Sequence, residues 1–240
     1  NMATISIRVS AGVDDATERS DDTNFATNGG ANTSIFSGRS GAGGNPFWYS
    51  AQRFQNVTIP PGSTINTATI TFTSTTTETN SALTDIIYGN DVDDAANFTT
   101  DADIVNRAVT TASASYSVPT SLTTDSTYTS SDISTIIQEI IDRAGWASGN
   151  AICIINKPNA ATVGDDVNYY TYSASTTKAV LLDIDYSPPA TFKTWNGVAV
   201  GGYSSSIAYD ASAKSSGSGA TTLTYAHTCT GSNRYLVVSC

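Results

Sequence analysis

Five aspartates are the strongest metal-ligand candidates in the chain. Asp91, Asp93 and Asp94 lie close together, and Asp101 and Asp103 follow shortly after. Carboxylate oxygens are hard ligands, and Ca²⁺ takes six to eight oxygens. The spacing is not that of an EF-hand loop, and aspartates in loops also form turns and caps. The cluster therefore predicts a structural calcium site, with solvated turn acids as the alternative.

Aromatic side chains form a second candidate site, for a glycan. The flat face of a pyranose ring presents C–H groups that stack on an aromatic ring. Side chains alternate between the two faces of a strand, so one residue of each neighbouring pair is expected to point outward. Packing in the core or against another subunit is the alternative for the same residues. The candidates are Trp48, Tyr49, Tyr169, Tyr170 and Tyr172.

Residues for enzyme chemistry are scarce. His227 is the only histidine, which argues against a Ser-His-Asp triad and against a histidine-based zinc site. A glycosidase needs two opposed carboxylates, and Glu139 belongs to the polar face of an expected helix. The glycine-rich residues 41–44 are not followed by the lysine of a phosphate-binding loop. We therefore predict a protein that is not an enzyme and needs no cofactor.

Charge and hydropathy limit the range of partners. The net charge is −10, which disfavours nucleic acid, because phosphate binding needs clustered cations. No run approaches the ~20 apolar residues that span a bilayer, so no membrane insertion is expected. Charged residues make up only 13% of the chain against ~25% in ordinary soluble domains. A surface rich in hydroxyl groups and poor in charges is common in secreted, cell-surface and virion proteins.

The start of the chain offers no basic segment followed by an apolar one, so the sequence predicts no signal peptide. Two interpretations remain open at this point. The chain fits a phage virion protein assembled inside the cell, and it fits equally a mature surface protein whose signal was removed. The predicted location is a virion surface or a cell surface.

Strand signals recur along most of the chain, with turn signals between them. Ala68, Ile70 and Phe72 alternate with threonines, which gives an apolar face backed by a hydroxyl face. Repeated alternation of this kind is typical of a β-sandwich. We expect residues 14–45 to form long loops and residues 120–131 a polar connector. The other expected strands are residues 4–10, 48–57, 83–88, 167–172 and 180–186.

One segment has the periodicity of a helix. Between residues 131 and 143, five isoleucines fall at positions i, i+3, i+4, i+7 and i+8 of a single helix face. We expect Ser131 to cap the start and Gly145 to end the helix. Gln138 and Glu139 are expected to face water. The isoleucines, expected to pack on a sheet, are Ile133, Ile136, Ile137, Ile140 and Ile141.

The apolar run at residues 151–155 predicts a strand in the core. Trp146, between this run and the helix, is expected to fill the gap between helix and sheet. Cys153 lies in the run and is expected to be a small buried hydrophobic residue. Cys229 and Cys240 would form a disulfide only if their strands adjoin, which spacing alone does not decide.

A boundary follows the expected closing strand. The prolines after Ser187 indicate a linker at residues 187–191. Residues 1–186 then form the main domain, and residues 192–240 form part of a second β-module with too few strands to stand alone. The second module is either truncated or completed by strand donation between neighbouring subunits.

A set of structural motifs follows in a fixed order: residues 53–65, 68–72, 132–133, 136–139 and 150–152. In this order they resemble the DNRLRE-type domain of bacterial secreted and surface proteins, over residues 4–186. The acidic string at residues 89–94 is also similar to strings in phage and metagenomic surface proteins. The resemblance implies a jelly-roll sandwich, and it carries no shared catalytic residues.

These observations predict an all-β chain: a jelly-roll-like antiparallel β-sandwich with one packed α-helix, followed by part of a second β-sandwich module. The predicted function is a non-enzymatic structural and adhesive component displayed on a virion or cell surface. It would act through multivalent contacts with other virion or surface subunits. The alternative is a carbohydrate-binding module appended to a glycan-active enzyme.

Overall fold

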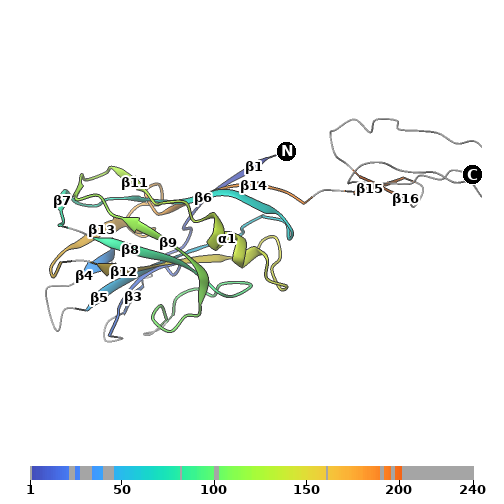
Figure 1. Cartoon of the computed structure of the whole chain (residues 1–240). Helices are drawn as coiled ribbons and strands as arrows, with labels where there is room; N and C mark the ends of the chain where they lie inside the picture. The colour runs from blue at the N-terminus through green and yellow to red at the C-terminus, as the bar shows by residue number, and fades with distance from the viewer. Residues whose placement is uncertain are drawn as a thin grey trace, which may run out of the picture. The chain divides into compact units, whose positions relative to one another are not determined.

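The computed structural model of the chain describes residues 2–21, 25–27, 34–39, 46–81, 83–99, 103–160, 162–189, 192–195 and 198–201. The chain divides into two compact units, Asn1–Pro189 and Ala190–Cys240. The larger unit contains β1 to β14 and the helix α1 (Figure 1). Among the described residues, no helix is long and apolar enough to cross a lipid bilayer.

The larger unit is an antiparallel β-sandwich with one packed helix. Its elements are β1 (Ala3–Arg8), β2 (Asp15–Arg19), β3 (Phe25–Thr27), β4 (Ser34–Arg39), β5 (Phe47–Phe54), β6 (Thr64–Thr73), β7 (Glu78–Thr79), β8 (Thr84–Asn90), β9 (Val109–Ser117), β10 (Ser121–Leu122), β11 (Thr127–Thr129), α1 (Ser134–Ile141), β12 (Ile152–Ala160), β13 (Asp166–Tyr170) and β14 (Leu181–Ser187).

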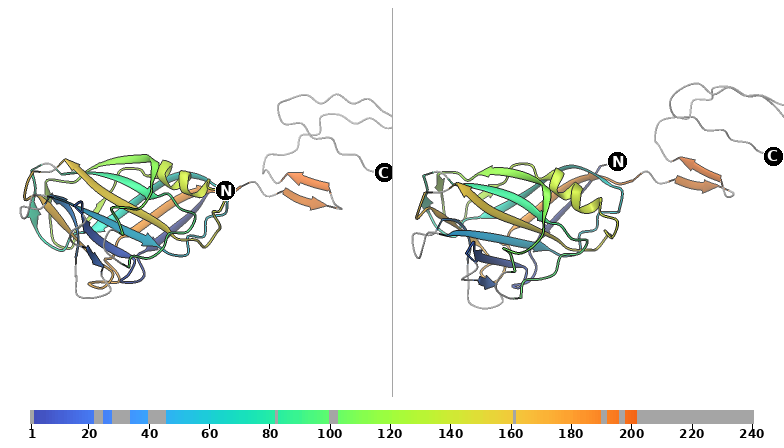
Figure 2. Two further views of the ribbon diagram at one scale, coloured as in Figure 1. Left: turned by 90° about the horizontal axis from the view of Figure 1, so that it is seen from below. Right: turned by 60° about the horizontal axis from the view of Figure 1, so that its bottom comes forward.

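The strand order is that of a jelly roll. One sheet has the order β1-β14-β6-β11, and the second has the order β13-β4-β5-β12-β8-β9. Within these, eight strands follow the double Greek-key pattern, with β1 beside β14 and β5 beside β12, and they alternate between the sheets except for β8 and β9. The two layers and the helix between their edges are visible in Figure 2. The predicted jelly-roll fold is confirmed in this unit.

The main core fills the space between the two sheets. On β6, the predicted alternation is confirmed, because Ala68, Ile70 and Phe72 are all buried there. On β14, the buried residues alternate in the same way with Asp183 and Asp185, which lie on the opposite face. Apolar residues on one face of each strand thus supply the hydrophobic stabilisation of the sandwich.

The helix α1 lies beside β6 of the first sheet and β9 of the second (Figure 1). All five isoleucines of its stripe are buried, as the spacing predicts. Gly89 on β8 lies directly under them, because a Cβ there would be 2.6 Å from Ile140 Cδ1 and 2.9 Å from Ile136 Cγ2. Trp146 is buried as well, and its indole donates a hydrogen bond to the Ile59 carbonyl at 3.0 Å.

The start of the helix differs from the prediction. The helix begins at Ser134, and the Ser131 hydroxyl donates instead to the Ser115 carbonyl on β9 at 2.8 Å. The N-cap position is Ile133, and the Oδ1 of Asp132, the residue before it, accepts from the Ser134 amide at 3.1 Å. The same Oδ1 accepts from the Ala68 amide on β6 at 2.9 Å. Tertiary contacts with both sheets therefore fix where the helix starts.

A long loop between β8 and β9 covers part of the outer face of the second sheet. Ala95, Phe98 and Ile104 from this loop pack in a separate hydrophobic cluster with residues of β5 and β12. Cys153 belongs to this cluster, and burial raises the pKa of its thiol to about 12. The Arg107 guanidinium lies 4.3 Å from the centre of the Phe98 ring. Cys153 is therefore a buried hydrophobic residue, as expected.

Two segments predicted as loops contain strands. Residues 14–45 include β2, β3 and β4, and residues 120–131 include β10 and β11. On β2 the buried side chains are polar, with Asp15, Thr17 and Glu18 at 1% exposure or less, so an apolar alternation was absent. The strand β9 was not predicted at all, because small and hydroxyl-bearing residues fill most of its positions.

In the second unit the structure describes one hairpin, formed by β15 (Phe192–Trp195) and β16 (Val198–Gly201) in antiparallel pairing. Cys229 and Cys240 lie outside the described residues. The assignment of residues 192–240 to a partial β-module, truncated or completed by a neighbour, stays a prediction.

Candidate functional site

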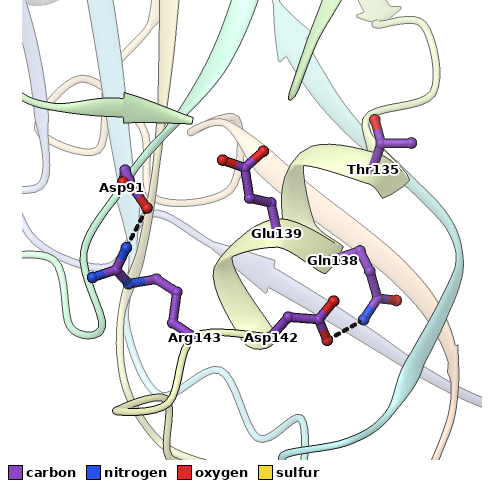
Figure 3. Close-up of a pocket in the computed structure, with 6 residues that line it drawn as sticks. All are labelled: Asp91, Thr135, Gln138, Glu139, Asp142 and Arg143. Atoms are coloured by element: carbon purple, nitrogen blue, oxygen red, sulfur yellow. Dashed lines mark hydrogen bonds and ion pairs between the residues drawn. The ribbon is translucent and has the colours of Figure 1, made fainter. Parts of the chain in front are cut away.

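The candidate site is an open, shallow depression on the outer side of α1. It has a volume of about 560 Å³. Figure 3 shows the helix side chains that line it and Asp91, which approaches from the end of β8. The lining residues are Asp91, Thr135, Gln138, Glu139, Asp142 and Arg143.

Arg143 is the cation of this depression, and it is held by two carboxylates. Its Nε donates to Asp93 Oδ1 at 2.7 Å, and its Nη1 donates to Asp91 Oδ1. These hydrogen bonds, with Asp93 contributing most, raise the pKa of the Arg143 guanidinium above its usual value. The pairs tie the loop after β8 to the residues after α1.

Glu139 faces β9 and does not point freely into water. Its two carboxylate oxygens accept hydrogen bonds from the backbone amides of Thr111 and Ala112, each at 2.7 Å. These amides belong to β9, which forms one edge of the second sheet. The expectation that Glu139 is simply a solvated residue is therefore wrong, because it completes the hydrogen bonding of a sheet edge.

Gln138 makes the equivalent connection to the other sheet. Its Oε1 accepts from the Ile65 amide on β6 at 2.8 Å, and its Nε2 donates to the Ser63 carbonyl at 3.2 Å. Nε2 also donates to Asp142 Oδ1 at 2.8 Å. Gln138 and Glu139, which are neighbours on one turn of α1, therefore bridge the two sheets.

Two polar side chains are exposed at the rim of the depression. Thr135 and Asp142 are exposed at its rim, and their oxygens are accessible to hydroxyl groups. Glu139 accepts two amide protons already, so it is not placed as a general acid that delivers a proton to a substrate.

The five predicted calcium ligands do not converge on one point among the described residues. Asp91 and Asp93 pair with Arg143, and Asp103 pairs with Arg107, with an Oδ1 to Nη2 distance of 2.7 Å. Asp94 Oδ1 accepts from the Ala151 amide at 2.8 Å. Asp101 lies outside the described residues.

No group of three or more acidic, histidine or cysteine side chains in the described part of the chain is arranged to hold a metal ion. The arginines instead supply the positive charge that calcium was expected to supply in this loop. Calcium binding stays a prediction, and it would require Ca²⁺ to displace a guanidinium group.

Tyr169 is not available to a glycan, and its prediction as a binding residue is wrong. Its side chain is 1% exposed, and its ring stacks on Phe72 with the centroids 4.6 Å apart. The strand β13 runs along β4 and touches β6 through a bridge between Ser74 and Tyr169. This contact places the Tyr169 side chain in the core. The alternation of the sequence alone did not decide which face of β13 is buried.

The remaining aromatic candidates are partly exposed, but cations cover three of them. The Arg19 guanidinium lies 5.9 Å from the Trp48 ring centre. Lysine ammonium groups lie over Tyr49 and Tyr170, at 5.4 Å for Lys157 and 4.7 Å for Lys178. Tyr172, the fourth, packs partly against the main core. A sugar stacking on these covered faces would have to displace the cation.

These aromatics also do not form one platform. In the register of the second sheet, Trp48 pairs with Gly38 on β4, and Tyr170 pairs with Ser34. Gly38 and Ser34 are four residues apart, which is roughly 13 Å along a strand. Four of the five predicted aromatics are therefore half-buried, and the register does not place them on one platform.

A buried polar cluster was missed from the sequence. Asp85 on β8 is 1% exposed, and it accepts a hydrogen bond from the Ser37 hydroxyl at 2.6 Å. Burial raises the pKa of Asp85 to about 7, and the Ser37 bond opposes this shift only in part. Tyr116 pairs with Asp85 in the sheet. Burial first and the Asp85 charge second raise the pKa of Tyr116 to about 12.

The hydroxyl groups of Tyr116 and Tyr169 have no hydrogen-bond partner among the described residues, although both are buried. An unpartnered buried hydroxyl is costly unless a water molecule satisfies it. Asp85, Ser37, Tyr116 and Tyr169 therefore form a polar cluster within the apolar core. No motif marks this cluster, because its members come from four different strands.

A comparison of the chain with protein-family models finds no match, and a comparison with curated proteins finds none either. The resemblance to the DNRLRE-type domain accordingly stays a prediction.

Proposed function

We propose that this chain is a non-enzymatic structural and adhesive component displayed on a phage virion or a cell surface. It acts through multivalent contacts with other virion or surface subunits. The observation that carries the proposal is the use of the carboxylates around the depression. Asp91, Asp93 and Glu139 are bonded to protein groups that close a loop and a sheet edge. Acids used in this way build a rigid display domain.

The exposed surface supports the same proposal. On β9, Thr111, Ser113, Ser115 and Ser117 all point outward and are exposed. Hydroxyl groups keep such a face hydrated without charge, and they offer many weak hydrogen bonds. Weak contacts of this kind become effective when many copies of the domain are displayed together, because linked binding events raise the apparent affinity by about 10² to 10⁴.

The adhesive role is tested by comparing the free chain with the chain coupled at high density to beads. The target is the surface of candidate host or partner cells. We expect bound beads and undetectable or weak binding of the free chain. Equal binding of beads with and without the chain would contradict the proposal.

The non-enzymatic role is tested by incubating the chain with a panel of polysaccharides and measuring new reducing ends. We expect no increase over buffer. A cleavage activity that Glu139→Gln or Asp142→Asn abolishes would overturn the proposal. Ser113→Ala is the matched control, because Ser113 is exposed and lies outside the depression.

Carbohydrate binding, as in a module appended to a glycan-active enzyme, is the second candidate. The open depression favours it, since its rim carries polar side chains of a kind that bind sugar hydroxyls. Thr135→Trp would fill the depression and remove glycan binding, measured on a glycan array. Thr124→Trp, at an exposed threonine outside the depression, is the control. Equal binding by both variants would exclude this site.

A further inference from the structure

The strand β1 forms one edge of the first sheet and pairs only with β14 in the described part of the chain. Val9, just after β1, donates its amide to the Val180 carbonyl at 3.1 Å. Directly opposite residues in antiparallel pairs alternate between bonded and non-bonded positions. Odd-numbered residues of β1 therefore bond to β14, and the N–H and C=O groups of Thr4, Ser6 and Arg8 point away from the sheet.

The edges at β9, β11 and β13 are protected at least in part, on β13 by Glu78, whose Oε1 accepts from the Asn168 amide at 2.9 Å. Glu139 and Ser131 bond to the backbone of β9. On the far side of the first sheet, β11 is only three residues long, and the side chains of Ser130 and Asp132 then bond to the β6 amides. The strands β2 and β4 both pair with β5. Proteins shield edges in this way because open edges pair with other chains.

Arg8 is the only charged residue of β1, and the other usual protective features are absent from this strand. Its sequence contains no proline and no lysine, and its register with β14 is unbroken from Ala3 to Arg8. Ala3, Ile5 and Ile7 pack against the rim of the core but remain partly exposed. A flat, regular edge with partly exposed apolar residues is a surface for strand addition.

We propose that β1 pairs with β1 of a second copy of this chain, antiparallel about a two-fold axis at Ser6. Strand pairing about such an axis is isologous, so both copies contribute the same groups. Ser6 then lies opposite Ser6 of the partner subunit. Even-numbered residues of one copy lie opposite even-numbered residues of the other. The outward-pointing N–H and C=O groups of the two strands therefore face each other.

The side chains match in this register. Ile5 lies opposite Ile7 of the partner subunit, and Ala3 lies opposite Val9 of the partner subunit, so the apolar face continues across the axis. An axis centred on Ile5 would also place even-numbered residues opposite even-numbered residues. That register aligns only residues 3–7, whereas the Ser6 register aligns residues 3–9. The longer overlap favours the Ser6 register.

Charge favours a second copy over an unrelated strand. Thr4 and Ser6 donate their hydroxyl protons to Asp185 and Asp183 on the outer face of the sheet. In the Ser6 register, Arg8 of each copy lies opposite Thr4 of the other, one strand away from Asp185. The Arg8 guanidinium donates to the Ala179 carbonyl of its own chain at 2.6 Å, and the pairing brings it beside the acidic row of the partner subunit. The pairing goes beyond the proposed function, because it holds whether or not the chain is adhesive.

Crosslinking tests the pairing and its register together. Bonded opposite residues have Cα atoms about 5.5 Å apart, which suits a disulfide. The full-length Ser6→Cys variant is expected to form a covalent dimer under mild oxidation, above the background of the parent chain. Thr4→Cys is the control, because the register does not place Thr4 opposite itself. Equal crosslinking of the two variants, or none with Ser6→Cys, would overturn the proposal.

Sedimentation of the full chain provides an independent test. Wild type and Ser6→Ala, which keeps the backbone N–H, are expected to dimerise with concentration. Ser6→Pro removes an N–H that β14 does not use, so the fold is retained while the dimer dissociation constant rises at least tenfold. Circular dichroism verifies the fold. A Ser6→Pro chain that folds and dimerises like wild type, or a wild type that stays monomeric, would contradict the pairing.

The two proposals fail in different ways. A dimer whose beads do not adhere to cells leaves the β1 pairing intact and overturns the adhesive function. If the beads adhere to cells but the chain never dimerises, the adhesive function stands and the β1 pairing is overturned.

Discussion

Arg143 Nε donates to Asp93 Oδ1 at 2.7 Å and so joins positions 50 residues apart in the chain. Asp91 binds the same guanidinium. One side chain after α1 therefore holds the loop that covers the second hydrophobic cluster. The sequence points to these aspartates as ligands of a cation, and the structure supplies that cation as an arginine.

Replacing Arg143 by alanine is expected to loosen this loop. The loop between β8 and β9 should be cut faster by a nonspecific protease, and the effect should shrink in high salt, where the wild-type pair is already screened. Limited proteolysis with mass spectrometry measures it. Lys178→Ala, which removes a different exposed ion pair, is the control and should leave cleavage of this loop unchanged.

The same variant examines the calcium prediction. With the guanidinium gone, Asp91 and Asp93 become open to Ca²⁺. We expect calcium to restore protease resistance to Arg143→Ala, and EDTA to remove that protection. If EDTA destabilises the wild-type chain as well, the wild type binds calcium in spite of Arg143. Melting curves with and without EDTA distinguish these results.

Glu139→Ala is expected to destabilise the domain by about 2 kcal/mol, because two edge amides lose a charged acceptor. Glu139→Gln keeps one acceptor oxygen and should cost less. Chemical denaturation measures the free energy of unfolding. Hydrogen exchange should accelerate first at Thr111 and Ala112. Unchanged protection of these two amides would show that the carboxylate does not hold the edge.

Asp85 makes stability fall as pH rises. Its pKa is about 7 in the folded chain against about 4 when unfolded, so the folded state binds the proton more tightly. The stabilisation is fully present below pH 4 and is lost as pH rises through 7, with an upper bound of roughly 4 kcal/mol. Measurements of unfolding free energy between pH 4 and 8 test this.

Asp85→Asn is the diagnostic variant, because it cannot ionise. It should flatten the pH profile between 4 and 8, and it should be more stable than the wild type at pH 8. Asp142→Asn changes an exposed carboxyl outside the core and should keep the wild-type slope. A wild-type profile without a fall toward pH 8 would show that Asp85 is solvated in solution.

Gly89→Ala is expected to destabilise the domain by about 1 to 3 kcal/mol through overpacking beneath α1. The added methyl group would meet Ile140 Cδ1 and Ile136 Cγ2 within 3 Å. Ile140→Val removes the nearer atom, so the double variant should recover part of the loss. Thermal melting of the single and double variants measures the coupling. Strictly additive effects would show that the two residues do not compete for space.

Residues whose pattern is strong were predicted well from the sequence. The isoleucine stripe of α1 and the alternation on β6 and β14 both place apolar residues toward the core, and hydrophobic burial alone decides such elements. The jelly-roll order followed from a resemblance to a family. The sequence of each strand alone does not show which strands pair with it in the sheet.

The failures have physical causes as well. The strand β9 was missed because its positions carry Thr, Ser and Ala, and its hydrogen bonds to β8 and to Glu139 hold it in place. The N-cap position is Ile133 and not Ser131, because both sheets bind the polar groups before α1. For Tyr169, a contact with β6 decided which face of β13 is buried. Each outcome depends on partners distant in sequence.

The adjacency of β1 and β14 has a mechanical consequence. Ala3 lies opposite Tyr186, so residues 2 and 189 leave the sandwich at the same end of two paired strands. Tension applied between these residues would load the hydrogen bonds of the pair one at a time, as in a zipper. The sandwich would therefore open at low force under such a pull, whereas a load along β6 or β12 would be shared by many bonds at once.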